Sequence, residues 1–169
     1  MITAPLAYLI TIRCYGTWLH GDHRGSVDRK KYHQYGGPQI QPNQKLNKAE
    51  AAQLKHPPFV LTDAQRAIVE DAIREVCDHR GYQLLAVNAR TNHVHSVIAA
   101  DCKPETVMNA IKAYATRRLR ASGLVANGVM PWSRHGSNPF LWTNEQVARA
   151  VDYVLNGQDD PPFDRDAPP

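Results

Sequence analysis

Short runs of apolar and β-branched residues predict three strands. The first run extends from Leu6 to Tyr15 and stops at Gly16. Two further runs, residues 83–89 and 93–99, are separated by only three residues, which is a common hairpin length. We therefore expect one strand near the start of the chain and a β-hairpin in its middle.

Apolar residues at helical spacing predict three long helices. The first begins in a capping box formed by Thr62 and Gln65, and the last begins in a similar box at Thr143. The middle helix starts at Pro104, a residue favoured at the first helical position. Glycines mark the ends of all three patterns, so the expected helices cover residues 62–80, 104–122 and 143–157.

In chain order the elements are strand, helix, strand, strand, helix, short strand and helix. Residues 124–142 are expected to be a loop, with the short strand over residues 139–142. The order is that of the ferredoxin-like βαββαβ sandwich, an α+β fold with an antiparallel sheet, followed by one added C-terminal helix. In that topology the first and third strands are central, so residues 93–99 should lie in the middle of the sheet.

The 169 residues are expected to form one domain, because 43% of them are hydrophobic and can build a single core. Two segments fall outside the regular pattern. Residues 20–58 form a basic irregular insertion, with one short helix over residues 47–55 that Asn47 and Glu50 could cap. Residues 159–169 form an acidic, Pro-rich tail.

Positive charge is concentrated in two segments. The chain carries 20 Lys and Arg against 16 Asp and Glu, with a sequence pI of about 9.1. Basic residues cluster in residues 23–58 and again in residues 103–120, where Lys112, Arg117 and Arg118 share one predicted helix. Such a surface fits a polyanion such as nucleic acid, but a solvated basic surface without a partner has the same composition.

Three cysteines, Cys14, Cys77 and Cys102, show neither CxxC spacing nor an even number. This argues against a disulfide framework and against a cysteine-based zinc site. No apolar run is long enough to span a bilayer or to act as a signal peptide. We therefore expect a cytoplasmic protein without a membrane segment.

The run Asn92-His93-Val94-His95 places two imidazoles on one predicted strand. Side chains alternate along a strand, so His93 and His95 point to the same face about 7 Å apart along the backbone, and Val94 points to the other. Such a pair can hold one metal ion. The alternative is that both histidines are hydrogen-bonded polar residues at a strand end.

Two tyrosines fall inside predicted helices, and helical phase separates them. Tyr114 lies between Val107 and Ile111 on the apolar stripe of its helix, so it is expected in the core. Tyr153 lies nearly opposite the centre of the apolar stripe of the last helix. Tyr153 is therefore expected at the surface or in a site.

A metal ion beside such a tyrosine, on a basic protein, suggests phosphoryl transfer on nucleic acid. The metal would polarise the scissile phosphate, the phenolate would attack it, and a covalent phosphotyrosine would conserve the bond energy for rejoining. An exposed helical tyrosine without a role is the alternative.

Aromatic and basic residues of the predicted loop offer a second contact with DNA. Trp132 and Trp142 could stack on single-stranded bases, or both could pack beneath the last helix, where Trp142 can contact Val147. Arg134 and His135 could neutralise phosphates.

These motifs resemble those of the single-tyrosine transposases of the histidine-hydrophobe-histidine (HUH) class, namely insertion-sequence-type transposases and the REP-associated tyrosine transposases. Asn92-His93-Val94-His95 is similar to the family's histidine motif, and Val151-Asp152-Tyr153-Val154 resembles its nucleophile helix. Tyr15-Gly16-Thr17-Trp18, with Gly21-Asp22 soon after, resembles its N-terminal pattern. The resemblance covers most of the chain in the same element order, but the insertion has no counterpart in it.

The resemblance implies a Mg²⁺- or Mn²⁺-dependent endonuclease and strand transferase that acts on single-stranded DNA, often with a recognised hairpin. His93 and His95 would be metal ligands, and Tyr153 would form a 5′-phosphotyrosine link. The residues expected to bind DNA are Lys112, Arg117, Arg118, Arg134 and His135.

The third metal ligand is where this chain departs from the family. Family members usually carry Asn or Gln four residues after the tyrosine, and this chain has Gly157 there. Asn156 would face the site if the helix persists through Gly157, whereas Gln158 would turn inward if the backbone unwinds at that glycine. Gln158 is the favoured ligand, because its longer side chain tolerates either backbone. With two imidazoles and one amide, the metal is expected to be weakly held.

Two other functions share some of these features. A ferredoxin-like nucleic-acid-binding module without chemistry would stack bases on its aromatic residues and use the histidines structurally. A relaxase-like or replication-initiator-like nicking enzyme would share the histidine pair and the tyrosine, but such proteins are usually larger, so the length of this chain favours a transposase. A homodimer is also open, with each tyrosine serving its own subunit's metal or the partner's.

Overall fold

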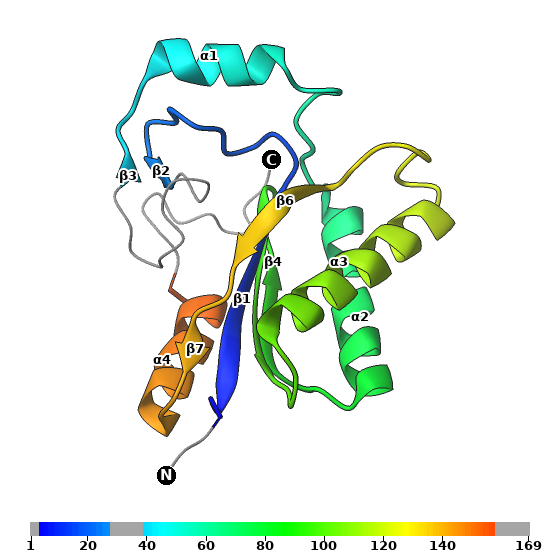
Figure 1. Ribbon diagram of the computed structural model, residues 1–169. Helices are drawn as coiled ribbons and strands as arrows, with labels where there is room; N and C mark the ends of the chain where they lie inside the picture. Colours follow the sequence, from blue (N-terminus) through cyan, green and yellow to red (C-terminus); the bar gives the residue numbers. More distant parts are fainter. Residues whose placement is uncertain (1–3, 28–38, 158–169) are drawn as a thin grey trace.

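The computed structural model describes residues 4–27 and 39–157. One antiparallel sheet stands at the centre, with α2 and α3 on one side, α4 on the other, and α1 beyond one end (Figure 1). The elements are β1 (Ala7–Cys14), β2 (Ser26–Val27), β3 (Gln39–Ile40), α1 (Gln44–Ala52), α2 (Asp63–Arg80), β4 (Gln83–Ala89), β5 (His93–Ala99), α3 (Pro104–Ala121), β6 (Trp132–Ser137), β7 (Phe140–Leu141) and α4 (Asn144–Leu155).

The strand order of the sheet is β4-β5-β1-β6, and β7 pairs with β1 along the same edge as β6. Every pairing is antiparallel. The prediction of an α+β fold with an antiparallel sheet is therefore confirmed, as is the central position of the first strand and of the histidine-bearing strand. β2 and β3 form a separate two-stranded ribbon.

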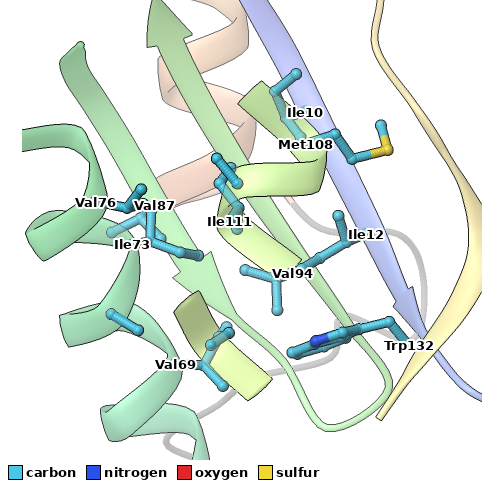
Figure 2. Close-up of a cluster of buried hydrophobic side chains, with 14 of the residues drawn as sticks. Ile10, Ile12, Val69, Ile73, Val76, Val87, Val94, Met108, Ile111 and Trp132 are labelled. Carbon is cyan, nitrogen blue, oxygen red and sulfur yellow. The ribbon is translucent and has the colours of Figure 1, made fainter. Parts of the chain in front are cut away.

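The larger core lies between the sheet and the helix pair α2 and α3. It contains paired residues of the two central strands, since Ile12 of β1 is the register partner of Val94 of β5, and each is 1% exposed. Figure 2 shows how side chains from both helices and from strands β1, β4, β5 and β6 meet around them; labelled there are Ile10, Ile12, Val69, Ile73, Val76, Val87, Val94, Met108, Ile111 and Trp132.

A smaller apolar cluster fixes α4 to the opposite face of the sheet. Its buried members come from four strands and one helix: Ala7, Ala86, Val97, Leu141, Ala150 and Val154. The capping box at Thr143 is present, with the Thr143 side chain accepting from the Gln146 N–H. The sheet therefore carries one thick helical layer and one single helix.

The predicted boundaries of the long helices are close to the observed ones, because clear capping residues mark where these helices begin and end. Thr62 and Gln65 form the expected capping box, and Gly81 takes the left-handed conformation at the end of α2, with φ of 70°. Tyr114 packs half-buried against the core between α2 and α3, as helical phase predicted, with its ring 6.2 Å from that of His79.

Two boundaries differ from the prediction. The short helix of the insertion was expected over residues 47–55, but α1 begins at Gln44, because Asn43 rather than Asn47 caps it by accepting from the Leu46 N–H. Part of the expected loop over residues 124–142 is strand β6, which pairs with β1 through an irregular register. Within the described residues, no helix is long and apolar enough to cross a bilayer.

Trp132 corrects a further expectation. It starts β6, is 6% exposed, and donates from its indole N–H to the Thr116 hydroxyl of α3 at 3.1 Å. Trp132 is therefore part of the larger core (Figure 2), neither available to stack on bases nor packed beneath the last helix. Trp142 is 39% exposed, and its ring lies 5.9 Å from that of Phe140.

Truncation of Ile12 should test how far the larger core depends on the central strand pair. Ile12→Ala should lower the free energy of unfolding by about 3 kcal/mol, because it removes three carbons from a fully packed position and leaves a cavity. Val60→Ala, at a position 55% exposed, is the matched control and should change it by less than about 0.5 kcal/mol. Urea denaturation measures both, and equal effects of the two substitutions would contradict the packing described.

Candidate active site

The two histidines lie side by side on the central strand β5. His93 and His95 point to the face that α4 covers, and their ring centroids are 4.5 Å apart with an angle of 70° between the ring planes. Directly opposite them on β1 are Arg13, the partner of His93, and Thr11, the partner of His95. The predicted placement of both imidazoles on one sheet face is therefore what the structure shows.

Each imidazole is oriented by a hydrogen bond at Nδ1. The Asn92 Oδ1 atom accepts from Nδ1 of His93 at 2.6 Å. Nδ1 of His95 meets the hydroxyl of Thr11 at 2.8 Å, and Thr11 is itself buried. A histidine whose Nδ1 is held in this way presents Nε2 to a metal, and such outer partners fix the ring for that role.

His93 is held in its neutral form. Burial, with smaller contributions from the nearby His95, Arg13, Arg90 and Arg24, lowers the pKa of His93 to about 3. A neutral imidazole is the form that binds metal ions, because the ligand nitrogen must carry a lone pair. The donor chemistry of this pair therefore fits a divalent cation.

Tyr153, on helix α4, lies beside the two histidines of strand β5. Its ring centroid lies 5.3 Å from that of His95, at an angle of 64°. The side chain is half-buried and packs against the edge of the smaller cluster rather than within its centre. Helical phase alone had placed Tyr153 outside the apolar stripe, and the structure brings it to the histidines of the same chain.

Asn88 fastens the end of α4 to the sheet beside this site. It lies on β4 as the register partner of His95, is 4% exposed, and donates from Nδ2 to the Val154 carbonyl at 2.9 Å. The bond joins the turn that carries Tyr153 to the strand next to the histidines. Sequence reasoning missed this residue, although an Asn inside an otherwise apolar strand was a signal.

The third ligand is not resolved in favour of either candidate. Gln158 lies outside the described residues. Asn156 is exposed and donates from Nδ2 to the Asp152 carboxylate at 2.9 Å. α4 ends at Leu155 and Asn156 leaves the helical conformation, with φ of −128°, so the helix does not persist through Gly157, although the Gly157 N–H bonds to the Tyr153 carbonyl at 3.0 Å. The choice between Asn156 and Gln158 therefore stays a prediction.

Gly157 itself lies against the tyrosine. A Cβ atom on this glycine would stand 3.1 Å from Cα and 3.4 Å from Cδ2 of Tyr153. Across the described parts of the chain, no group of three or more His, Cys, Asp or Glu residues is placed to hold a metal. A metal bound by His93 and His95 would therefore take its remaining ligands from amide, water or phosphate oxygens.

The predicted DNA-binding residues lie on α3 and on the edge strand β6. Lys112 donates to the backbone carbonyls of Ser133 and Arg134, so its ammonium group ties α3 to β6. Arg117 and Arg118 are exposed, and Arg118 pairs with Glu75 at 3.6 Å. Arg134 and His135 are exposed on β6. An open hollow of about 520 Å³ on this surface is lined by Lys112, Ala113, Thr116, Arg117 and Arg120.

Comparisons with known proteins place the chain in a family. The family profile described as "Transposase IS200 like" matches residues 54–152, which include both histidines and most of α4 but stop one residue before Tyr153. A comparison with curated proteins found no significant match.

Two solved structures are similar in fold. One is a REP-associated tyrosine transposase bound to a REP hairpin, with a TM-score of 0.51 and 13% identity over 91% of this chain and 67% of that chain. The other, a crystal structure of a proposed transposase from Deinococcus radiodurans, has a TM-score of 0.47 and 14% identity over 92% of each chain, too low a similarity to support an argument. Because the family profile covers more than half of the sequence, the protein belongs to the IS200-like transposase family.

Proposed function

We propose that this protein is a metal-dependent endonuclease and strand transferase that cuts single-stranded DNA through a 5′-phosphotyrosine on Tyr153. One observation carries the proposal. The phenol ring of Tyr153 stands 5.3 Å from the ring of His95, which shares a sheet face with His93. A histidine pair with only a structural role has no need of a tyrosine brought to it from another element, whereas phosphoryl transfer needs a nucleophile beside the metal.

His93 and His95 would hold Mg²⁺ or Mn²⁺ through Nε2, with the side chain of Gln158 proposed as the third protein ligand. A divalent ion held there would polarise the scissile phosphate and stabilise the charge that develops on its oxygens. Imidazole is a modest ligand for these hard cations, so water and substrate oxygens would fill the remaining positions.

The chain's own residues would position and perform the transfer. The Tyr153 phenol gives up its proton and its oxygen bonds to phosphorus, while the bond from phosphorus to the 3′-oxygen of the preceding nucleotide breaks. That 3′-oxygen takes up a proton and leaves as a hydroxyl. Attack by another 3′-hydroxyl on the phosphotyrosine reverses these changes and joins two strands, because the ester energy has been kept.

Single-stranded DNA with a hairpin is the proposed substrate. The structurally similar REP-associated transposase was solved with a REP hairpin bound. Here Lys112, Arg117 and Arg120 of α3 line the open hollow, and these basic residues suit a folded DNA segment held by its phosphates. Because Tyr153 faces the histidines of its own chain, we propose that it serves its own subunit's metal; a homodimer stays a prediction.

Replacing the nucleophile gives the most direct test. Tyr153→Phe removes only the hydroxyl, so it should abolish the covalent adduct with a single-stranded oligonucleotide carrying the hairpin that flanks the gene. The adduct is measured by denaturing gel electrophoresis with Mn²⁺ present. Tyr114→Phe is the matched control, since Tyr114 packs between α2 and α3. An adduct that survives in Tyr153→Phe would show that another residue is the nucleophile.

The histidines should separate cleavage from binding. His93→Ala and His95→Ala should each lower the cleavage rate by about 100-fold or more, because the metal loses one of two imidazoles. DNA affinity should fall less than about threefold, since it depends mainly on phosphate neutralisation by basic residues. A non-catalytic binding module would instead show no metal dependence in the wild type and an equal loss of binding and folding in both variants.

Metal titration should decide the third ligand. Gln158→Ala should raise the Mn²⁺ concentration for half-maximal cleavage roughly tenfold, because a protein ligand has been removed. Asn156→Ala should leave that concentration unchanged, since Asn156 bonds to Asp152. An unchanged metal requirement in both variants would mean that water or substrate fills the position.

A further inference from the structure

Two arginines, Arg13 near the end of β1 and Arg24 in the segment that follows, have no part in the function proposed so far. Arg13 and Arg24 both stack on Trp18, with their Cζ atoms 3.6 and 4.1 Å from the centre of the indole ring. Two planar groups at these distances cannot share one ring face without overlapping, so the indole lies between them. Trp18 is thereby covered by cations on both faces and is not a platform for a DNA base.

Hydrogen bonds fix this stack in one position. Arg24 donates from Nε and Nη2 to the two carboxylate oxygens of Asp22, each at 2.7 Å, and from Nη2 to the Thr17 carbonyl at 3.0 Å. The Trp18 indole N–H donates to the Gly25 carbonyl at 2.8 Å. The arrangement is therefore preorganised by the segment that contains the Gly-Thr-Trp and Gly-Asp motifs.

The stack begins beside the histidine pair, on the side away from the tyrosine. Arg13 is the register partner of His93, and opposed residues of antiparallel strands point to the same sheet face. Tyr153 contacts the other histidine, His95. Along this face the order is consequently Tyr153, the two imidazoles, Arg13 and then the indole with Arg24.

The charge at this end of the site is positive. Arg13 is the register partner of His93, and Arg24 stacks on the same indole as Arg13, so two guanidinium groups lie at this end of the site. Asp22 is the carboxylate paired with Arg24, and it offsets one of these two cations. A phosphate oxygen is an anionic acceptor that a guanidinium group binds well.

We infer that Arg13 and Arg24, stacked on Trp18, bind the backbone phosphate of the departing DNA strand, on the 5′ side of the bond that is cut. The inference rests on the proposed phosphotyrosine mechanism. In an in-line displacement the attacking and leaving oxygens lie on opposite sides of phosphorus. With the phenol of Tyr153 at one side of the histidines, the leaving 3′-oxygen and its strand point toward Arg13.

A neutral-linkage experiment tests the assignment. Methylphosphonate linkages, which remove a phosphate charge, are placed one at a time along the hairpin oligonucleotide on both sides of the mapped cleavage bond. Binding is measured in the Tyr153→Phe background, where no cleavage occurs. The neutral linkage immediately 5′ of the cleavage bond should weaken binding about tenfold, as expected for loss of a charged hydrogen-bonded contact.

Substitution of Arg13 or Arg24 should remove only the loss of DNA binding that the neutral linkage 5′ of the cleavage bond causes. With Arg13→Gln or Arg24→Gln added, the same linkage should weaken binding less than twofold, while linkages 3′ of the bond act as before. Arg13→Lys keeps a positive charge and should retain most of the response, which separates a phosphate contact from a folding defect. Arg74→Gln, exposed on α2 across the sheet, is the matched control and should retain all of it.

The outcomes are distinct. An adduct with the wild type, together with a response that Arg13→Gln and Arg24→Gln leave intact, would overturn this inference and keep the proposed function. A response confined to linkages 3′ of the bond would place the stack on the retained strand and also overturn it. Binding without any adduct at any oligonucleotide would overturn the proposed function and, with it, this inference.

Discussion

The antiparallel pairing of β1 with β5 is the constraint on which the rest of the structure depends. The same register pairs Ile12 with Val94 on the core face and Thr11 with His95 on the other. Because side chains alternate along both strands, the pairing that fills the core also orients the site, and a slip of one residue would turn the imidazoles into the hydrophobic layer. Fold and site are thus specified by one set of backbone hydrogen bonds.

The attachment of α4 to the sheet positions Tyr153 but lowers the stability of the fold. The cluster beneath α4 is small, and Asn88 adds a buried hydrogen bond to the Val154 carbonyl at the helix end. Its Oδ1 atom is buried without a hydrogen-bond partner among the described residues, which is unfavourable in a core. An apolar residue would pack there without that penalty, but it would not hold the turn that carries Tyr153 beside His95.

The sequence predicted the elements whose signals are local. Caps at Thr62 and Thr143 and clear periodicity predicted the long helices, and alternation predicted the hairpin and the shared face of the histidines. Strand β6 was missed because it is an irregular, polar edge strand containing Gly136, which reads as a loop. The structure explains that glycine, since a Cβ there would collide with the Thr11 carbonyl and with Met108.

The candidate site was predictable from the sequence only in part, because only some of its features depend on residues within a single element. The imidazole pair and the phase of Tyr153 follow from spacing within one element, whereas the contact between them depends on how α4 docks on the sheet. Asn88 and the Arg13 stack belong to tertiary contacts between distant segments, and no local pattern distinguishes their roles.

Gly157 has a consequence for how this chain can change over time. The related transposases that the sequence resembles usually carry an amide residue at this position, yet any side chain here would press on Tyr153 at 3.1 Å. Restoring that amide would therefore require the end of α4 to shift by a few tenths of an ångström. The residue at position 157 and the placement of Tyr153 are coupled, so the effect of an amide there depends on how readily this helix end gives way.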